Sequence, residues 1–432
     1  MKKVLIISYV FPPTGGAGVQ RISKFVKNLV KFDWTISVLT ALNPSVPTSD
    51  DSLLSDIPES IQIYRSRTLE PKYTFKSGFK KNVQESGGFF GKLKEIIKTL
   101  IKAALLPDPQ VLWWPLSSIS LFQIILKNKI DVIFVSGPPF SALLFAVFWG
   151  KLFKIPVVSD FRDEWTFSRN TWEHLPKLNF IRHLDRKFEK YVVKNSIYIT
   201  VASPFYEKDI KKNYGIKNCE TITNGFDRED FKFNKNFDHD FLIDENKINF
   251  VYSGTVWSAT SLCPFIKALE NLIAQEPALT RKIQLLVIGR VVPEEEYYFR
   301  HVSKLGIVKL LGYIDHDLLI QYISSADILL LSLANLHGSE KIIPGKIFEY
   351  MMCKAPVLSM IPNGACSEII SKIKGFYIVD PDNIDTIEKI ISDFAARPKK
   401  SLPVNKTGIE YFSRYYLTKQ LSHILDVSAG HH

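Results

Sequence analysis

Short apolar runs alternate with longer amphipathic segments along most of the chain, and this alternation limits the possible folds more than any other feature of the sequence. A strand buried on both faces of a parallel sheet is a short apolar run, and a helix covering that sheet is apolar along one face. The repeated order predicts βαβ units. We therefore expect an α/β protein with doubly wound parallel sheets.

The expected strands form two series with a polar segment between them. They are 3–9, 34–39, 61–64, 132–135, 156–159, 197–202 and 221–223, followed by 248–253, 284–288, 308–310, 328–331, 356–359 and 376–379. Residues 224–245 are charge-rich and have no apolar period, which is typical of an interdomain linker. The chain of 432 residues is thus predicted to contain two Rossmann-like domains, 1–240 (including the linker) and 241–405.

The positive charge is confined to the first of these regions. Residues 1–240 carry 35 basic and 24 acidic side chains, whereas residues 241–432 carry 20 of each. This excess predicts an anionic partner for the N-terminal half. No recognised nucleic-acid module accompanies the basic stretches, so a nucleic acid is not expected.

Targeting and cysteine signals are weak. The longest apolar region, 132–158, is interrupted by Gly, Pro and Lys, so no transmembrane helix is expected. Four cysteines without a CxxC or Cys/His ligand spacing predict reduced thiols in a cytosolic protein and no metal site. Residues 430–432 resemble the remnant of a purification tag.

A glycine-rich segment follows the first expected strand and precedes a helix that begins near Ala17. Gly15, Gly16 and Gly18 would let the backbone approach an anion at the helix start. Arg21 stands where a dinucleotide fingerprint would have its third glycine, and no acidic residue follows the second strand, so nicotinamide binding is not expected. The alternative is a turn with only a structural role.

A second motif ends the expected strand at 156–159 and contains Asp160, Arg162 and Asp163. Ligands of open α/β sheets bind at the carboxyl ends of strands. There Asp163 could accept a proton, Arg162 could bind phosphate and Asp160 could orient either group. A solvated charge cluster or an internal ion pair is the alternative.

A third motif lies in the second half. A loop containing Gly338, Ser339 and Glu340 precedes a helix in which Lys346 and Glu349 share one face. Lysine at a helix start suits a diphosphate, and a carboxylate one turn later can accept hydrogen bonds from two ribose hydroxyls. A surface ion pair is the alternative.

The excess positive charge also has a local pattern. Lys92, Lys94, Lys98 and Lys102 flank apolar residues, which predicts a basic amphipathic helix in the headgroup region of a membrane, or else a helix packed on its own domain. Trp113 and Trp114 belong either to the mouth of an acceptor site or to the core.

Together the three motifs resemble the family 4 glycosyltransferases of GT-B fold, especially those of cell-surface polysaccharide synthesis. Further segments that carry the resemblance are 136–139, 222–227, 252–255, 287–289, 311–313 and 326–327. The resemblance implies two domains facing each other across a cleft, with the nucleotide-sugar donor held mainly by the C-terminal domain. It also implies an acceptor on the N-terminal domain, transfer with retention of configuration, no metal and no cofactor.

By position, the resemblance assigns Glu349 to the ribose and Lys346 to the diphosphate of the donor. It assigns Gly338, Ser339 and Glu340 to the transferred sugar, and Asp163 with Arg162 to the reacting centre. Gly15, Gly16, Gly18, Thr255 and Arg290 would also bind the donor. Two departures are visible: Lys341 stands where the family pattern has its first glutamate, and residues 254–260 contain no Arg or Lys.

The sequence thus predicts a retaining glycosyltransferase, cytoplasmic and peripheral on the inner face of the cell membrane. It would transfer a sugar, most simply from a UDP-sugar, to a lipid-linked oligosaccharide. A helix within 406–429 would return to the N-terminal domain. The alternatives are a non-catalytic or weakly active donor-binding subunit of an assembly complex and a nucleotide-sugar epimerase of the same fold.

Overall fold

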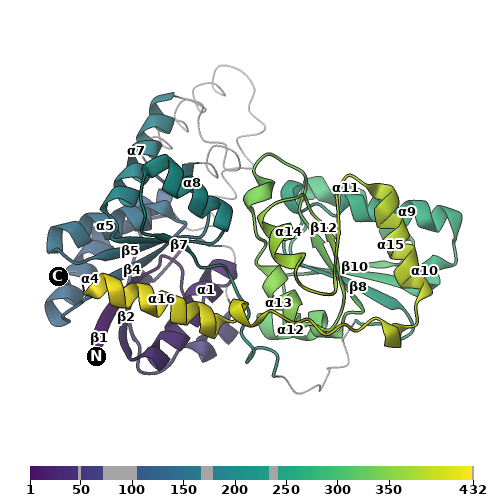
Figure 1. Cartoon of the computed structure of the whole chain (residues 1–432), viewed down its shortest axis with the longest axis horizontal. Coiled ribbons are helices and arrows are strands. Elements are labelled where there is room, and N and C mark those ends of the chain that lie inside the picture. Colours follow the sequence, from purple (N-terminus) through teal and green to yellow (C-terminus); the bar gives the residue numbers. More distant parts are fainter. Residues whose placement is uncertain (47–49, 72–104, 167–178, 233–241, 431–432) are drawn as a thin grey trace. The chain divides into compact units, whose positions relative to one another are not determined.

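The computed structural model describes residues 1–46, 50–71, 105–166, 179–232 and 242–430. Contacts divide the chain into two compact units (Figure 1). The first unit comprises Met1–Thr223 and Leu417–His432, and the second comprises Asn224–Tyr416. The boundary between them falls at the start of the polar segment that begins at residue 224.

The first unit contains a parallel sheet of seven strands in the order β3-β2-β1-β4-β5-β6-β7. The strands are β1 Lys2–Ile7, β2 Trp34–Ala41, β3 Gln62–Ser66, β4 Val132–Gly137, β5 Val157–Phe161, β6 Tyr198–Val201 and β7 Cys219–Thr221. Strands β2 and β3 are added on one side of β1, and β4 to β7 are added on its other side, so the strand order switches between β1 and β4. Such a switch point leaves a crevice for ligands at the carboxyl ends of the strands.

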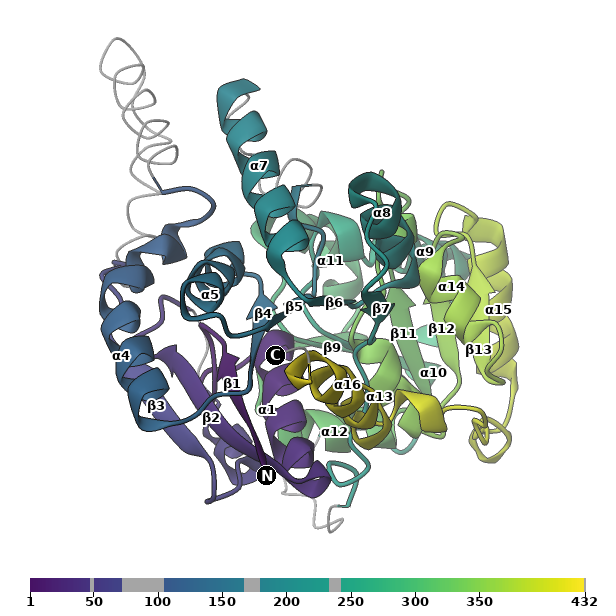
Figure 2. The same cartoon turned by 60° about the vertical axis from the view of Figure 1, so that its left-hand side comes forward.

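Helices cover both faces of this sheet (Figure 2). Leu5 and Ile7 of β1 belong to one apolar cluster, and Val4 and Ile6 belong to the other, because successive side chains of a strand point to opposite faces. The helices of the first cluster are α4 Trp114–Lys127, α5 Phe140–Phe153, α7 Asn179–Asn195 and α8 Pro204–Tyr214. Those of the second are α1 Ala17–Leu29 and α16 Arg414–Ala429.

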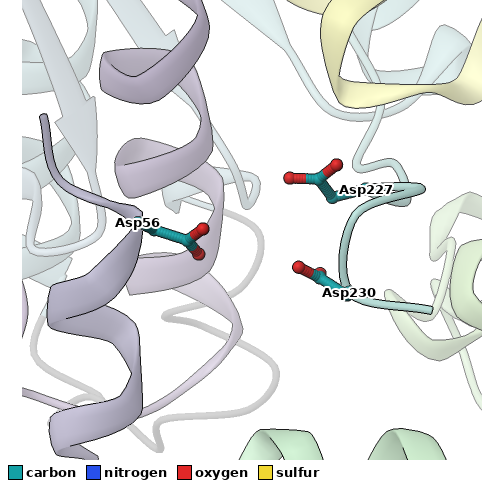
Figure 3. A group of neighbouring side chains, drawn as sticks. All are labelled: Asp56, Asp227 and Asp230. Atoms are coloured by element: carbon teal, nitrogen blue, oxygen red, sulfur yellow. The ribbon is translucent and has the colours of Figure 1, made fainter. Parts of the chain in front are cut away.

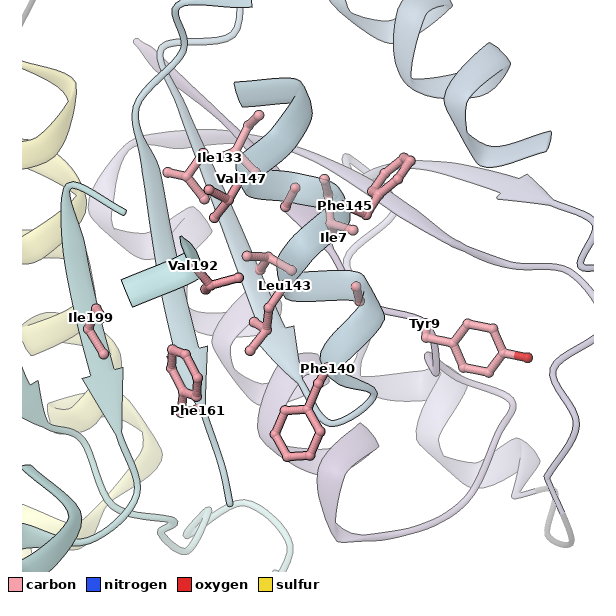
Figure 4. Close-up of a cluster of buried hydrophobic side chains, with 14 of the residues drawn as sticks. Ile7, Tyr9, Ile133, Phe140, Leu143, Phe145, Val147, Phe161, Val192 and Ile199 are labelled. Carbon is pink, nitrogen blue, oxygen red and sulfur yellow. The ribbon is translucent and has the colours of Figure 1, made fainter. Parts of the chain in front are cut away.

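The core under α5 is densely apolar. Phe140, Leu143, Phe145 and Val147 of this helix pack with side chains of β4 and β5 such as Phe161 (Figure 4). A buried face of this kind is what fixes α5 on the sheet.

The second unit contains a parallel sheet of six strands in the order β10-β9-β8-β11-β12-β13. The strands are β8 Ile248–Ser253, β9 Ile283–Ile288, β10 Val308–Gly312, β11 Ile328–Ser332, β12 Val357–Met360 and β13 Phe376–Val379. The helices on one face are α9 Cys263–Gln275, α10 Leu279–Lys282, α11 Pro293–Lys304 and α15 Ile384–Ala396. Those on the other are α12 His316–Ser325, α13 Lys346–Met352 and α14 Ala365–Ile370.

The predicted α/β class with two doubly wound sheets is confirmed, and every expected strand is present. The last strand of the first series, β7, begins and ends two residues earlier than expected. From Leu417 onward α16 packs on the first unit, where Trp34 Nε1 donates a hydrogen bond to Ser422 Oγ at 3.0 Å.

Two further expectations concern membranes and thiols. Over the described ranges, no helix has both the length and the apolar character needed to cross a bilayer. All four cysteines are free thiols, and Cys219, Cys353 and Cys366 are buried.

Candidate functional site

Three glycines bring the loops after β8, β9 and β10 of the second unit into close contact. Gly254, Gly289 and Gly312 have φ angles of 115°, 127° and 71°, which favour glycine. A Cβ atom on Gly289 would lie 2.4 Å from the carbonyl oxygen of Gly254. Gly289 N–H in turn donates a hydrogen bond to Gly312 O at 2.6 Å. The carboxyl edge of this sheet is therefore lined by closely spaced backbone, where a ligand can approach.

Lys346, the first residue of α13, extends its ammonium group toward the end of β8. Its Nζ lies 3.6 Å from the centroid of the Tyr252 ring, and a Cβ on Gly254 would be 3.0 Å from the same atom. Burial lowers the pKa of this ammonium to about 7, although the Glu349 carboxylate acts in the opposite direction. In the described part of the chain, no carboxylate forms an ion pair with Lys346. An anionic ligand would restore the full charge of the group.

Glu349 lies one turn further along α13 and is held by a histidine. Its Oε1 is 3.0 Å from Nε2 of His316, the first residue of α12. The His316 and Glu349 side chains are 7% and 17% exposed. Among the described residues nothing donates a hydrogen bond to Oε2 of Glu349, so this oxygen can accept one from a ligand.

Tyr350 fastens α13 to the sheet. Its hydroxyl oxygen accepts a hydrogen bond from Ser253 N–H at 3.0 Å and lies 3.1 Å from Ser253 Oγ. Tyr350 is fully buried. Because Ser253 is the last residue of β8, this contact sets the position of Lys346 and Glu349 relative to the glycine-lined edge.

In the loop before α13, the Glu340 carboxylate accepts a hydrogen bond from the same loop. Glu340 Oε2 accepts a hydrogen bond from Gly338 N–H at 2.9 Å. Ser339 is 1% exposed, and its Oγ has no partner among the described residues. A Cβ on Gly364 would lie 2.1 Å from the carbonyl oxygen of Glu340, so the loop rests directly on the glycine that precedes α14.

The two remaining donor-domain predictions, Thr255 and Arg290, are both exposed. One main-chain bond joins the β8 and β9 loops, because Val256 N–H donates a hydrogen bond to Arg290 O at 2.8 Å. Tyr252 OH donates one to Thr255 O at 3.1 Å within the β8 segment. Among the described residues neither side chain forms an ion pair, and the exposed Arg290 is accessible to a ligand of the second unit.

In the first unit, the glycine loop before α1 rests on Arg162. Gly16 has a φ angle of 115°, and a Cβ on Gly18 would lie 3.0 Å from Cζ of Arg162. The Arg162 guanidinium donates hydrogen bonds to the carbonyl oxygens of Pro138 and, at 3.5 Å, Gly18. Arg162 therefore supports the loop from within, while the neighbouring Asp163 is exposed.

A fully buried ion pair lies below this loop. Arg21 Nη2 is 2.8 Å from Asp160 Oδ1, and both side chains are 0% exposed. Arg21 also donates hydrogen bonds to the carbonyl oxygens of Ile222 and Thr223. Burial by itself would raise the pKa of the Asp160 carboxyl, but Arg21 and hydrogen bonds from Ser136 and Thr200 hold it below its usual range. Asp160 therefore forms an internal ion pair, which was the alternative interpretation of the motif at the end of this strand.

The structure describes the two tryptophans predicted for the acceptor mouth or the core, but not the four lysines predicted for the membrane. Trp113 is 1% exposed, and its Nε1 donates a hydrogen bond to Ser66 Oγ at 2.7 Å. Trp114 is half-buried and donates one to Ser141 O at 3.1 Å. Trp113 therefore belongs to the core, where its indole N–H has a partner. Lys92, Lys94, Lys98 and Lys102 lie outside the described residues.

Three aspartates are drawn together in Figure 3, and each has contacts within its own unit. Asp56 pairs with Lys24 at 2.7 Å and with Lys27 at 2.8 Å in the first unit. Asp227 and Asp230 lie on one turn of the second unit, in which Asp227 Oδ1 accepts a hydrogen bond from Glu229 N–H at 3.0 Å. The Asp56 carboxylate is therefore already neutralised by lysines.

Sequence reasoning did not identify the roles of Tyr252, His316 and Arg21. Tyr252 and Arg21 stand inside motifs that the sequence singled out, yet their partners are distant in the chain. His316 follows the motif at 311–313 and had no signal of its own, since its contact with Glu349 spans 33 residues.

Comparison with solved structures supports the fold over the whole chain. Sucrose-phosphate synthase from Thermosynechococcus elongatus has a TM-score of 0.64 at 14% identity, covering 99% of both chains. Anabaena Alr3699/HepE in complex with UDP-glucose has a TM-score of 0.61 at 15% identity, covering 99% of this chain and 100% of that one. WaaG, a glycosyltransferase involved in lipopolysaccharide biosynthesis, has a TM-score of 0.55 at 12% identity, covering 98% and 95%.

Sequence comparison identifies the family. No curated protein matches the chain significantly. The model of Glycosyltransferase Family 4 matches residues 83–230, in the first half of the chain, and that of Glycosyl transferases group 1 matches residues 247–396, in the second. The two family models match the N-terminal and C-terminal regions in this order, and each region contains a doubly wound sheet. This arrangement is the GT-B architecture. The chain therefore belongs to the family 4, group 1 glycosyltransferases.

Proposed function

We propose that this protein is a retaining glycosyltransferase that transfers a hexosyl group from a UDP-sugar to a lipid-linked oligosaccharide. The acceptor would be an intermediate of a capsule, O-antigen or exopolysaccharide. One observation carries the donor half of this proposal: Lys346, without an ion-pair partner in the described ranges, and Glu349, with an open oxygen, stand one turn apart on α13.

These two side chains match the two polar parts of a nucleotide sugar. A diphosphate beside Lys346 would neutralise the desolvated ammonium, and vicinal ribose hydroxyls can both donate hydrogen bonds to the Glu349 carboxylate. The missing side chain of Gly254 makes room for the Lys346 ammonium itself, since a Cβ there would lie 3.0 Å from its Nζ. UDP as the carrier is supported by the likeness to the Anabaena protein, which binds UDP-glucose.

The chemistry follows from the leaving group. As the acceptor hydroxyl replaces the nucleoside diphosphate at the anomeric carbon, negative charge increases on the leaving phosphate oxygens. A protonated Lys346 stabilises that charge without a metal, and the exposed Arg290 can add a second cation. Residues 254–260 contain no cation, so Lys346 would have the role that two side chains have in the common family pattern.

The proposed lipid-linked acceptor is supported by the charge of the first unit and by the likeness to WaaG in fold. The first unit holds the excess of positive charge, as expected of a domain that meets lipid diphosphates at the inner face of a cell membrane. WaaG, which shares the fold, acts in lipopolysaccharide biosynthesis. Asp163, exposed beside the glycine loop, is the candidate to receive the proton of the acceptor hydroxyl.

The donor site is tested by thermal shift against a panel of nucleotide sugars, because a ligand that binds only the native state stabilises it. We expect UDP-sugars to raise Tm, and Lys346→Ala and Glu349→Ala to abolish both this shift and the release of UDP. Lys304→Ala, on α11 of the same unit, is the matched control and should behave as wild type. Normal donor binding in both site variants would refute the assignment.

The cation-free β8 loop also favours a second candidate, a donor-binding subunit with little or no catalysis. Such a protein would show the thermal shift but no release of UDP with membrane extracts containing lipid-linked acceptors. An epimerase has the same fold; it would convert the donor into its epimer without acceptor, which NMR of the nucleotide sugar would detect.

A further inference from the structure

Helix α5 of the first unit is apolar on its outer face as well as on its inner face. Ser141 and Lys151 are its only polar side chains. The inner face packs on the sheet, but Phe148 and Leu152 are 46% and 60% exposed. A helix that is apolar all round is expected to be covered on all sides.

Helix α4 continues the same apolar surface. Ile119, Phe122 and Leu126 recur at helical spacing and are 58%, 48% and 70% exposed. Aromatic contacts join the two helices: the rings of Phe122 and Phe153 are 6.1 Å apart, and those of Trp114 and Phe148 are 6.2 Å apart. We define the α4–α5 patch as Ile119, Phe122, Leu126, Phe148 and Leu152. Contiguous exposed apolar surface of this kind marks an interaction site.

The charged residues of α4, α5 and their connection are nearly all positive. Residues 114–154 contain four lysines, Lys127, Lys129, Lys151 and Lys154, and all four are exposed. Their one acidic residue, Asp131, accepts a hydrogen bond from Lys3 N–H at 2.7 Å. The α4–α5 patch is therefore accompanied by unneutralised cations at the C-terminal ends of both helices.

This charge decides between the possible occupants. A second copy of the chain would add four further lysines to the contact and no complementary carboxylate. Residues 72–104 of this chain are also positive, with eight basic and two acidic side chains, and so offer no complementary charge. An anionic bilayer matches both properties, because apolar and aromatic side chains enter the boundary of headgroups and acyl chains while lysines meet lipid phosphates.

We propose that the α4–α5 patch docks the first unit on an anionic lipid bilayer. The inference deepens the proposed function, whose acceptor is lipid-linked, by assigning the membrane contact to described residues other than the predicted helix at 92–102. The exposed side chains of α4 and α5 lie at the level of the headgroups, and the helices do not cross the bilayer.

The test is co-sedimentation of the full chain with phosphatidylcholine vesicles, with and without phosphatidylglycerol. We expect binding only to the anionic vesicles, because one cation near an anionic leaflet changes partitioning about fivefold. The charge variant replaces Lys127, Lys129, Lys151 and Lys154 by Gln; the apolar variant carries Phe122→Ser, Leu126→Ser and Leu152→Ser. Each should weaken binding on the order of tenfold or more.

A matched control carries Tyr297→Ser, Leu310→Ser, Lys304→Gln and Lys309→Gln, all in the second unit, where Tyr297 and Leu310 are 67% and 47% exposed. It should bind vesicles as wild type does. All variants should keep the thermal shift with the UDP-sugar, so a failure of membrane docking is distinguished from a failure of the donor site.

Three results would overturn the proposal. In the first, wild-type protein does not bind anionic vesicles. In the second, both α4–α5 variants bind like wild type, whereas replacing Lys92, Lys94, Lys98 and Lys102 by Gln removes binding. In the third, the apolar variant changes the oligomeric state without changing vesicle binding, which would identify the patch as an interface between copies.

Discussion

The carboxyl ends of the two sheets both carry charged side chains, but these side chains have different partners. In the first unit, Arg21 pairs with the buried Asp160, and Arg162 donates hydrogen bonds to the carbonyl oxygens of Pro138 and Gly18. In the second unit, Lys346 is desolvated, and the described residues supply no ion-pair partner. A buried charge with complete pairing stabilises a scaffold, whereas a buried charge without a partner lowers stability and gains from a ligand. The comparison supports the proposal that the carboxyl edge of the second sheet binds the ligand.

The largest effect is expected for the paired charges of the first unit. Asp160→Ala leaves the Arg21 guanidinium buried and unpaired, so the free energy of unfolding should fall by about 3–5 kcal/mol. Chemical denaturation measures this loss. Asp163→Ala, three residues along at an exposed position, is the control and should have a small effect on stability. A small loss in Asp160→Ala would mean that the pair is dispensable.

Lys346 should show the reverse behaviour. Lys346→Met removes a desolvated cation, so the ligand-free protein should be as stable as wild type or more stable. The rate of sugar transfer should nevertheless fall ~10²–10³-fold, because the charge on the leaving diphosphate loses its stabilising group. Denaturation and kcat measured on the same preparation test both parts. A destabilised but fully active Lys346→Met protein would contradict the contrast between the two units.

The pH dependence of donor binding follows from the lowered pKa of Lys346. With a pKa of about 7 in the free protein, Lys346 is mostly charged below pH 7. Above pH 7 it is mostly neutral, so binding of a diphosphate is accompanied by uptake of a proton on Lys346. Donor affinity should therefore fall as pH rises above about 7, by at most ~10-fold per pH unit. The free energy of unfolding of the ligand-free protein should rise with pH over this range, because the unfolded chain binds more protons than the folded protein.

Titration calorimetry in buffers of different ionisation enthalpy measures the proton uptake directly. In Lys346→Met both pH trends should disappear, while Lys304→Met should keep them. Donor binding without proton uptake above pH 7 would show that the lysine is already charged in the free protein.

The smallest effect is expected at His316, which acts on the ligand through Glu349. His316→Ala removes the hydrogen bond to Glu349 Oε1 and should weaken UDP binding about tenfold, the lower end of the range for a hydrogen bond to a charged group. His316→Gln should restore much of it, because its amide can donate to the same oxygen. With 2′,3′-dideoxy-UDP, which lacks the ribose hydroxyls, His316→Ala should have little further effect. Equal losses for both ligands would indicate a purely structural role.

Local pattern was sufficient for most of the fold. Each strand is a short apolar run whose burial on two faces requires little knowledge of its neighbours, so the runs at 248–253 and 328–331 correspond to β8 and β11. The position of Lys346 and Glu349 on one face of a helix was also predictable, because residues three apart are neighbours on any helix surface.

The sequence by itself therefore determined the α/β class, the two series of strands, the segments that end at the carboxyl edges and the family resemblance, since these depend on short-range periodicity and spacing. Only the tertiary structure decided how each charge is used. The Arg21–Asp160 pair spans 139 residues, the His316–Glu349 contact spans 33, and Trp113 became core through its contact with Ser66. Such partners are brought together by the order of strands in a sheet, which allows distant segments to meet at one edge and which no local pattern encodes.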